Sequence, residues 1–285
     1  MLSYLQAAIL GLLQGISELF PISSFGHSIL LPALLGWSVD QNASYFLTFL
    51  VATHFATALV LFLFYWKDWV RIFLGVIRSI SQRTIRANPD AQLGWLLVVG
   101  TIPAGLVGVV FQKRVQELFT SPSFVASFLI LNGALLYVAE FLRRKAKRGF
   151  GTHDADERIA AEVSWRQSAG VGVMQVLALL PGFSRTGSTI AGGLMVGLAH
   201  EDALRFSFLL ATPIIAAAAV LKLPLLFASR DAAAILMVLL GASCAAIASY
   251  LSVKFLTRYF KTRTLTPFAI YCVIFGVISL LLLRS

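Results

Sequence analysis

Apolar residues dominate the chain in long runs that short polar stretches separate. A membrane-spanning helix needs about 20 apolar residues, and three runs in the first half are long enough: about 44–66, 92–111 and 123–142. The first run, 2–36, is different because Pro21 and the serines after it interrupt it. It predicts two half-helices that enter and leave the membrane on the same side, a geometry whose backbone must be covered by protein or water.

A second polar break follows at Pro181–Thr189, again between apolar runs that are too short to cross a bilayer. It contains Arg185, several hydroxyl side chains and two glycines. A guanidinium surrounded by hydroxyls and glycine amides is suited to holding a phosphate group. We expect the two breaks to face each other and the rest of the chain to be their scaffold.

The second half of the chain repeats the pattern of the first. At an offset of 161 positions, Gly11, Gln14, Ser23, Gly26, Ile29 and Gly36 match Gly172, Gln175, Ser184, Gly187, Ile190 and Gly197. Further matches at other offsets are Phe49–Thr53 with Phe208–Thr212, and Lys113 and Phe119 with Lys254 and Phe260. Because the matches keep their order, they predict one membrane domain, 1–285, of two repeats, about 1–145 and 165–285, with a connector at about 146–164.

Each repeat is predicted to hold one broken re-entrant helical hairpin and three transmembrane helices, in an all-α polytopic membrane protein. Three is an odd number of crossings, so the second repeat begins on the opposite side of the membrane from the first. The repeats then have inverted topology, and their hairpins enter from opposite faces and meet near the midplane.

The basic residues indicate the orientation. This topology puts the stretches 67–90, 143–166 and 254–263 on one side, and they carry 16 of the 23 lysines and arginines. Cytoplasmic loops are enriched in these residues, so this side is predicted to face the cytoplasm. Both termini and the mouth of the first hairpin then face outward.

The composition fits a membrane protein and excludes other classes. Hydrophobic residues make up 58% and charged residues 13% of the chain, against about 25% charged residues in soluble domains. The net charge of +10 fits basic loops, and we predict no nucleic-acid partner because no stretch interleaves aromatic and basic residues. Cys244 and Cys272 are interpreted as packing residues, and the connector as a solvated link.

The first break carries residues suited to acid–base chemistry. Gln14 and Glu18 are four residues apart and share a helix face, and His27 begins the return segment. Ionisable residues inside a membrane point to function, so Glu18 and His27 are candidates for proton transfer. Ser24 is a candidate nucleophile if His27 activates it, and direct attack by water is the open alternative. His54, alone within a span, is interpreted as structural or cavity-lining.

The second break supplies the predicted phosphate site. Arg185 offers a fork for phosphate oxygens, and Gly182 and Gly187 offer backbone amides at a half-helix N-terminus. Side chains predicted to complete the substrate-binding set are those of Gln14, Ser23, Ser184, Thr186, Ser188 and Thr189. Glu18 is also a candidate ligand of a divalent cation. The break is not a P-loop, because the chain has no Gly-Lys-Ser/Thr there.

These motifs resemble those of the bacterial undecaprenyl-diphosphatase family, the bacitracin-resistance integral-membrane phosphatases. Gln14–Glu18 matches its motif Glu/Gln-x-x-x-Glu, and Pro21–His27 matches Pro-x-Ser-Ser-x-Gly-His. Pro181–Thr189 matches its second motif, Pro-Gly-x-Ser-Arg-Ser/Thr-Gly-x-Thr, without a gap. With the internal duplication, the resemblance covers nearly the whole chain.

The resemblance implies an enzyme that removes one phosphate from undecaprenyl diphosphate at the outer face of the bacterial inner membrane. The reaction recycles the lipid carrier for peptidoglycan synthesis. Glu18, His27 and Arg185 are implied to be essential and Ser24 to be the nucleophile, often with the aid of a divalent cation, Mg2+ or Ca2+. A homodimer is left open.

Two positions depart from the family pattern. Gln14 replaces the commoner first glutamate, which weakens any two-carboxylate metal site, and Phe25 replaces a small hydroxyl residue. Inverted repeats with broken helices are also transporter architecture, so a transporter or flippase of polyprenyl phosphate is the alternative function. A pure transporter needs no nucleophile or proton relay, and the cluster of Glu18, Ser24 and His27 therefore favours the phosphatase.

Overall fold

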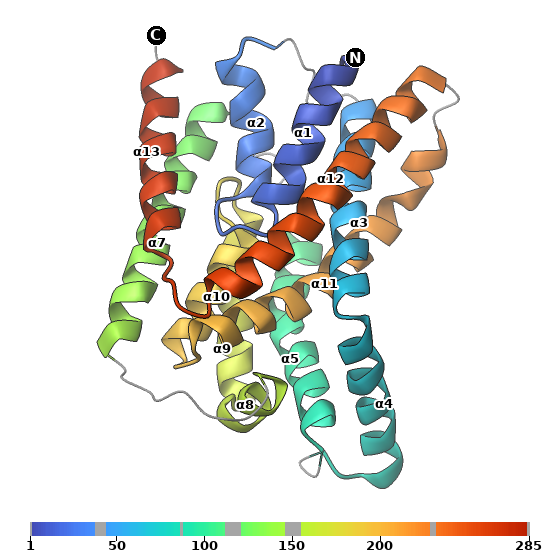
Figure 1. The fold of residues 1–285 in the computed structure, drawn as a ribbon, viewed down its shortest axis with the longest axis vertical. Helices are drawn as coiled ribbons and strands as arrows, with labels where there is room; N and C mark the ends of the chain where they lie inside the picture. Colours follow the sequence, from blue (N-terminus) through green and yellow to red (C-terminus); the bar gives the residue numbers. More distant parts are fainter. Residues whose placement is uncertain are drawn as a thin grey trace.

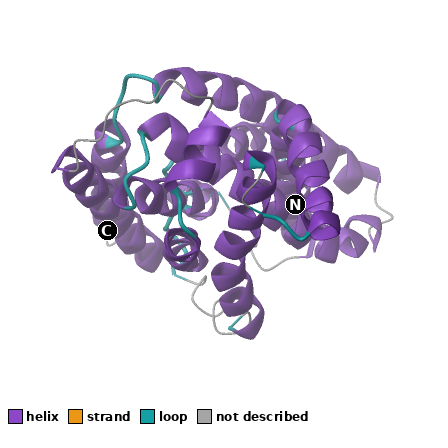
Figure 2. Cartoon of the chain, turned by 90° about the horizontal axis from the view of Figure 1, so that it is seen from below, coloured by secondary structure: helices purple, strands orange, loops and turns teal. Residues whose placement is uncertain are grey.

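A computed structural model describes residues 2–37, 44–85, 88–111, 121–145, 155–228 and 232–283. Within these ranges the regular structure is helical and no strand occurs (Figure 2). The helices are α1 (Tyr4–Ser17), α2 (Ser24–Leu34), α3 (Ser44–Phe64), α4 (Trp66–Gln82), α5 (Pro89–Val110), α7 (Pro122–Lys145), α8 (Ala155–Glu162), α9 (Trp165–Val176), the short 3-10 helix η2 (Leu177–Leu179), α10 (Arg185–Met195), α11 (His200–Ala228), α12 (Ala232–Tyr259) and α13 (Thr266–Leu282).

Four of the described helices are long and apolar enough to cross a bilayer: α3, α5, α7 and α12. The first three coincide with the apolar runs of the first half, so the predicted all-helical, polytopic membrane fold is confirmed. Many of their large apolar side chains lie on the outside of the molecule, as expected where lipid surrounds a helix. Lys113 and Phe119, which contributed to the predicted repeat, lie outside the described residues.

The two polar breaks each separate a pair of short helices. α1 and α9 have 14 and 12 residues, and α2 and α10 have 11 each. At 1.5 Å per residue even a 14-residue helix reaches only about 21 Å, less than the roughly 30 Å of a bilayer core. In Figure 1, α1 and α2 fill the upper part of the molecule, and α9 and α10 lie below them.

Equivalent helix starts in the two halves have the same local geometry. α1 begins with a capping box in which Ser3 and Gln6 satisfy each other's backbone amides, and Ser164 and Gln167 repeat it at α9. Such a box supplies partners for amides that a helix start leaves unpaired. The offset is again 161 positions, so the repetition extends to helix caps that the sequence comparison did not use.

The return helices also match at both ends. α2 is capped by Ser23 and α10 by Ser184, each accepting from the amide three residues later. Both helices are followed by a glycine with positive φ, Gly36 at 63° and Gly197 at 103°, a conformation that glycine adopts without steric cost.

Reciprocal close contacts join the two halves. α1 packs against α12, and α9 packs against α5. At each crossing two glycines meet: a Cβ on Gly11 would overlap the carbonyl oxygen of Gly241, and a Cβ on Gly172 would overlap that of Gly100. Small residues allow membrane helices to approach this closely, so the first helix of each hairpin is anchored on a helix from the other half.

An ion network centred on the buried carboxylate of Asp156 holds α4, α8 and α11 together at one end of the molecule. Asp156 accepts from Nε of Arg205 at 2.6 Å and from Nη2 of Arg71 at 3.0 Å. Asp68 also contacts both arginines, at 3.1 Å and 2.7 Å. The basic stretch 67–90 is largely the helix α4. The second part of the connector, which was expected to be a solvated link, is instead the helix α8 with the buried carboxylate of Asp156.

The three basic stretches lie near one another at this end. Arg71 joins α4 to α8 through Asp156, while Glu201 lies 3.9 Å from both Arg158 and Lys261. In Figure 1, α8 and the end of α4 are at the bottom, whereas α1 begins and α13 ends at the top. The end of the molecule that carries the basic stretches (the basic end) and the end where α1 begins and α13 ends (the terminal end) are therefore opposite.

Candidate active site

A cavity of about 330 Å³ lies where the two polar breaks meet α3. Its polar residues come from the α1–α2 turn, α3 and the start of α10. Its apolar walls come from α3, α11 and the breaks themselves, and include Leu47, Leu50, Phe183, Ile214 and Ile215. The expectation that the two breaks face each other is met, because both line this one cavity.

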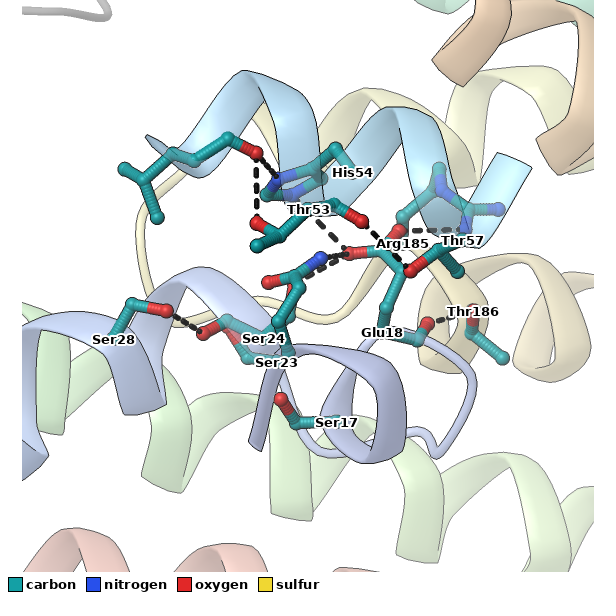
Figure 3. Close-up of polar contacts among 12 residues, drawn as sticks. Ser17, Glu18, Ser23, Ser24, Ser28, Thr53, His54, Thr57, Arg185 and Thr186 are labelled. Carbon is teal, nitrogen blue, oxygen red and sulfur yellow. Dashed lines mark hydrogen bonds and ion pairs between the residues drawn. The ribbon is translucent and has the colours of Figure 1, made fainter. Parts of the chain in front are cut away.

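Arg185 and Glu18 form an ion pair across the cavity (Figure 3). Nη2 of Arg185 donates to Oε1 of Glu18 at 2.8 Å, and the two side chains are only 12% and 7% exposed. The other terminal nitrogen of Arg185, Nη1, is buried and has no hydrogen-bond partner among the described residues. A buried charged donor without a partner is costly, so this nitrogen is suited to an anion that enters the cavity.

The second oxygen of Glu18, Oε2, collects three more polar groups. Ser24 Oγ donates to it at 2.5 Å and Gln14 Nε2 at 3.2 Å. His54 Nε2, from α3, lies 3.4 Å away. Glu18 is therefore the centre of the cluster, and its carboxylate is placed to accept the proton of the Ser24 hydroxyl.

Two helix N-termini point into the cavity. Ser23 and Ser24 begin α2, Ser184 and Arg185 begin α10, and all four residues line the cavity. A helix N-terminus carries a partial positive charge and attracts anions. Ser23 has a positive φ of 70°, a strained conformation for a residue other than glycine.

His27 supports this strained turn from behind. Its Nδ1 lies 2.7 Å from the backbone oxygen of Ser23, and its Nε2 lies 2.7 Å from the hydroxyl of Tyr271. The ring stacks on Tyr271 and on Phe275 and does not line the cavity. Both ring nitrogens are thus engaged away from Ser24, so the structure does not show the contact with His27 on which activation of Ser24 was made conditional. The hydrogen-bond partner of Ser24 is Glu18 instead.

Asn132 of α7 joins the two breaks. Its Nδ2 donates to the backbone oxygen of Pro21 at 3.0 Å, and its Oδ1 accepts from the amide of Ser184 at 3.1 Å. Thr186 adds a second link by donating to the backbone oxygen of Glu18 at 2.8 Å. These bonds fix the distance between the turns that carry Glu18 and Arg185.

The remaining predicted binding residues lie behind the cavity wall. The Gly187 amide bonds to Ser184 Oγ, and Gly182, with φ of 105°, packs closely against the backbone of α7. Thr189 Oγ1 contacts Ser207, and Ser188 Oγ is buried without a partner among the described residues. None of these four residues, nor Gln14 and Thr186, is part of the cavity lining.

Sequence reasoning missed the contacts of two residues. His54 was expected to be structural or cavity-lining; it does line the cavity, but its contact with Glu18 was not foreseen. Asn132 was not singled out at all. An amide side chain inside an apolar run is itself a signal, because polar groups in membrane helices usually find a partner on another helix.

The donor set does not fit a divalent cation held by the protein. Mg2+ and Ca2+ take six or more oxygen ligands, typically with more than one carboxylate or with substrate phosphates. In the part of the chain that the structure describes, Glu18 is the only carboxylate that lines the cavity, and its oxygens already accept hydrogen bonds from Arg185, Ser24 and Gln14. No group of three histidine, cysteine or acidic side chains that could hold a metal occurs within the described ranges.

The fold and the cavity define a multi-pass membrane protein. Its cavity places an arginine and two helix N-termini around a carboxylate and a serine hydroxyl, those of Glu18 and Ser24. The chain belongs to the family of the bacitracin resistance protein BacA, whose family model matches residues 7–278. An undecaprenyl-diphosphatase of Mycolicibacterium paratuberculosis is 48% identical over 98% of this chain and 97% of its own length. Those of Frankia alni and Acidiphilium cryptum are 41% and 45% identical, each over 97% of both chains.

Proposed function

We propose that this protein hydrolyses undecaprenyl diphosphate to undecaprenyl phosphate and inorganic phosphate. The relatives that match nearly the whole chain carry the name of this activity. The observation that carries the proposal is the buried Nη1 of Arg185, which has no hydrogen-bond partner among the described residues, beside the Ser24–Glu18 hydrogen bond. A phosphate oxygen on Nη1 would satisfy the arginine and bring phosphorus next to the serine hydroxyl.

The apolar walls of the cavity suit the lipid part of this substrate. Leu47, Leu50 and Ile214 line it together with Phe25 and Phe183, and Leu47 is 41% exposed. The prenyl chain would lie along these side chains and leave toward lipid, while the diphosphate meets Arg185 and the two helix N-termini.

In the proposed reaction, Ser24 Oγ attacks the terminal phosphorus as its proton passes to the Glu18 carboxylate. The bond from this phosphorus to the bridging oxygen breaks, and undecaprenyl phosphate leaves with that oxygen. Water then attacks the phosphoserine and breaks its P–Oγ bond. Glu18 returns its proton to Ser24 Oγ, and the phosphate leaves with both protons of the water. Arg185 stabilises the charge on the phosphoryl oxygens in both steps. Direct attack by a water on Glu18 is the alternative route.

The proposal includes an inverted arrangement of two repeats in the bacterial inner membrane. The matching capping boxes, the matching glycines and the reciprocal glycine contacts support two equivalent halves. The clustering of basic stretches at one end supports a cytoplasmic assignment for that end. The termini and the cavity mouth beside the first turns of α3 would then face outward.

The test is phosphate release from undecaprenyl diphosphate by purified protein in detergent. We expect wild-type protein to release phosphate and Arg185→Ala to lose at least about 10²-fold in kcat/KM. Arg166→Ala, which changes an exposed arginine of α9, is the matched control. Wild-type protein that binds undecaprenyl phosphate but releases no phosphate would overturn the proposal in favour of transport.

A further inference from the structure

The imidazole of His54 faces Glu18 in a fixed orientation. Its Nδ1 lies 2.8 Å from the backbone oxygen of Leu50, and a carbonyl oxygen can only accept, so Nδ1 carries the hydrogen of that bond. Nε2 lies 3.4 Å from Oε2 of Glu18 (Figure 3). A nitrogen lone pair would be repelled by the carboxylate, so this contact is attractive only when Nε2 is protonated too and the ring is a cation.

Gln14 makes this arrangement stable without a metal ion. Its Nε2 donates a hydrogen bond to Oε2 of Glu18 at 3.2 Å. A carboxylate in its place would have no hydrogen to donate. A glutamate at position 14 would instead repel Glu18 at this distance unless a cation lay between them. The glutamine therefore removes both a metal ligand and the repulsion that a metal ion would relieve.

The charges in the cavity then match those of a metal site. Arg185 and protonated His54 contribute two positive charges and Glu18 one negative charge, a net charge of +1. A cavity with an arginine, two glutamates and one divalent cation would have the same net charge. Either arrangement presents a diphosphate with the same net charge, which adds to the partial positive charge of the two helix N-termini.

We infer that His54, and not a divalent cation held by the protein, supplies the second positive charge for the substrate diphosphate. The inference rests on the proposed function for the identity of the ligand. Binding and hydrolysis of the diphosphate by this chain therefore do not need Mg2+ or Ca2+. His54 acts here as an electrostatic binding residue from α3, an element that carries no part of the two sequence motifs.

The first experiment measures binding without hydrolysis. The probe is the methylene-bridged analogue of farnesyl diphosphate, titrated into metal-depleted protein in EDTA and again in Mg2+. For wild-type protein we expect a Kd that changes by less than about twofold between the two conditions, and for His54→Gln a Kd at least about tenfold weaker in EDTA. His200→Gln is the matched control, because His200 contacts a carboxylate, Glu140, outside the cavity, and should bind as wild type does.

The second experiment replaces the positive charge of His54 by a metal ion held between two glutamates. The double variant Gln14→Glu with His54→Gln should bind the probe about tenfold more tightly in Mg2+ than in EDTA, and Mn2+ resonance spectra should show metal bound to it but not to wild-type protein. Thermal unfolding confirms that each variant is folded. Wild-type binding that strengthens tenfold with Mg2+, or His54→Gln binding that is unchanged in EDTA, would overturn the inference.

Phosphate release separates this inference from the proposed function. If wild-type protein releases phosphate equally in EDTA and Mg2+, both hold. If it releases phosphate only in Mg2+, the function holds and the inference fails. If it releases none in either condition, the proposed function fails, and the binding data alone decide the role of His54.

Discussion

Arg185 donates to Glu18 at 2.8 Å although the two residues are 167 positions apart in the chain. Each comes from a different polar break, and Asn132 fixes the two breaks against each other through Pro21 and Ser184. The proposed phosphate-binding group and the proposed base are therefore positioned by one rigid junction, as an enzyme requires of groups that must meet a single substrate.

Ser24→Ala tests the nucleophile. Because Ser24 Oγ donates to Glu18, we expect phosphate release to fall by at least about 10³-fold while the analogue still binds. Ser127→Ala, at an exposed serine whose hydroxyl donates to the Ser123 backbone oxygen within α7, is the control. Full activity in Ser24→Ala would show that water attacks the substrate directly. A phosphoserine trapped at Ser24 in wild-type protein would show that the serine is the nucleophile.

His27→Phe tests the supporting role of the buried histidine. Phenylalanine keeps the stacking on Tyr271 and Phe275 but loses the bond to the Ser23 carbonyl. We expect kcat to fall about tenfold, and the midpoint of thermal unfolding to fall because Tyr271 loses its buried partner. Analogue binding should change less than kcat. A loss as large as that of Ser24→Ala, without lower thermal stability, would instead place His27 in the reaction.

Asp156→Asn tests the ion network at the basic end. Asp156 is nearly fully buried, whereas Arg205 and Arg71 are 19% and 47% exposed and would keep Asp68 as a partner. The variant should therefore cost what a lost hydrogen bond to a charged group costs, about 1.5–3 kcal/mol. Thermal unfolding in detergent should show the loss. Asp68→Asn, at a carboxylate that is 19% exposed, should cost less. If the two variants lost equal thermal stability, burial of the carboxylate would not determine how much it contributes.

Leu35→Cys tests the orientation. Leu35 follows α2 at the terminal end of the molecule and is 54% exposed. In a chain whose Cys244 and Cys272 are replaced by alanine, a membrane-impermeant maleimide should label it from outside intact cells. Gln82→Cys, at the end of α4, should be labelled only after lysis. The reverse pattern would show that the basic end faces outward.

The sequence predicted the helices and the meeting of the two breaks because proline, glycine and charge interrupt apolar runs in a way that only a broken helix explains. It also placed Glu18, Ser24 and Arg185 in one cluster. It could not assign partners within the cluster. His27 and Ser24 are neighbours in sequence, but the turn at Ser23 directs the imidazole toward α13 and leaves Glu18 as the partner of the serine.

Contacts made by helices outside the motifs could not be predicted from the sequence for a related reason. His54 and Asn132 each lie in an otherwise apolar helix, and only the packing of that helix decides which of its faces meets the cluster. The connector was misjudged because its charges suggested solvent, whereas Asp156 finds two arginines from other helices. Long-range pairing of this kind has no short-range signature in a single sequence.

The glycine crossings carry a consequence for the origin of the chain. α1 rests on α12 through Gly11 and Gly241, and α9 rests on α5 through Gly172 and Gly100. Neither half contains the surface on which its own first helix docks. If the two proposed repeats descend from one half-length ancestor, that ancestor would have needed a second copy of itself to supply these docking surfaces, and fusion of the two genes would have joined such a pair into one polypeptide.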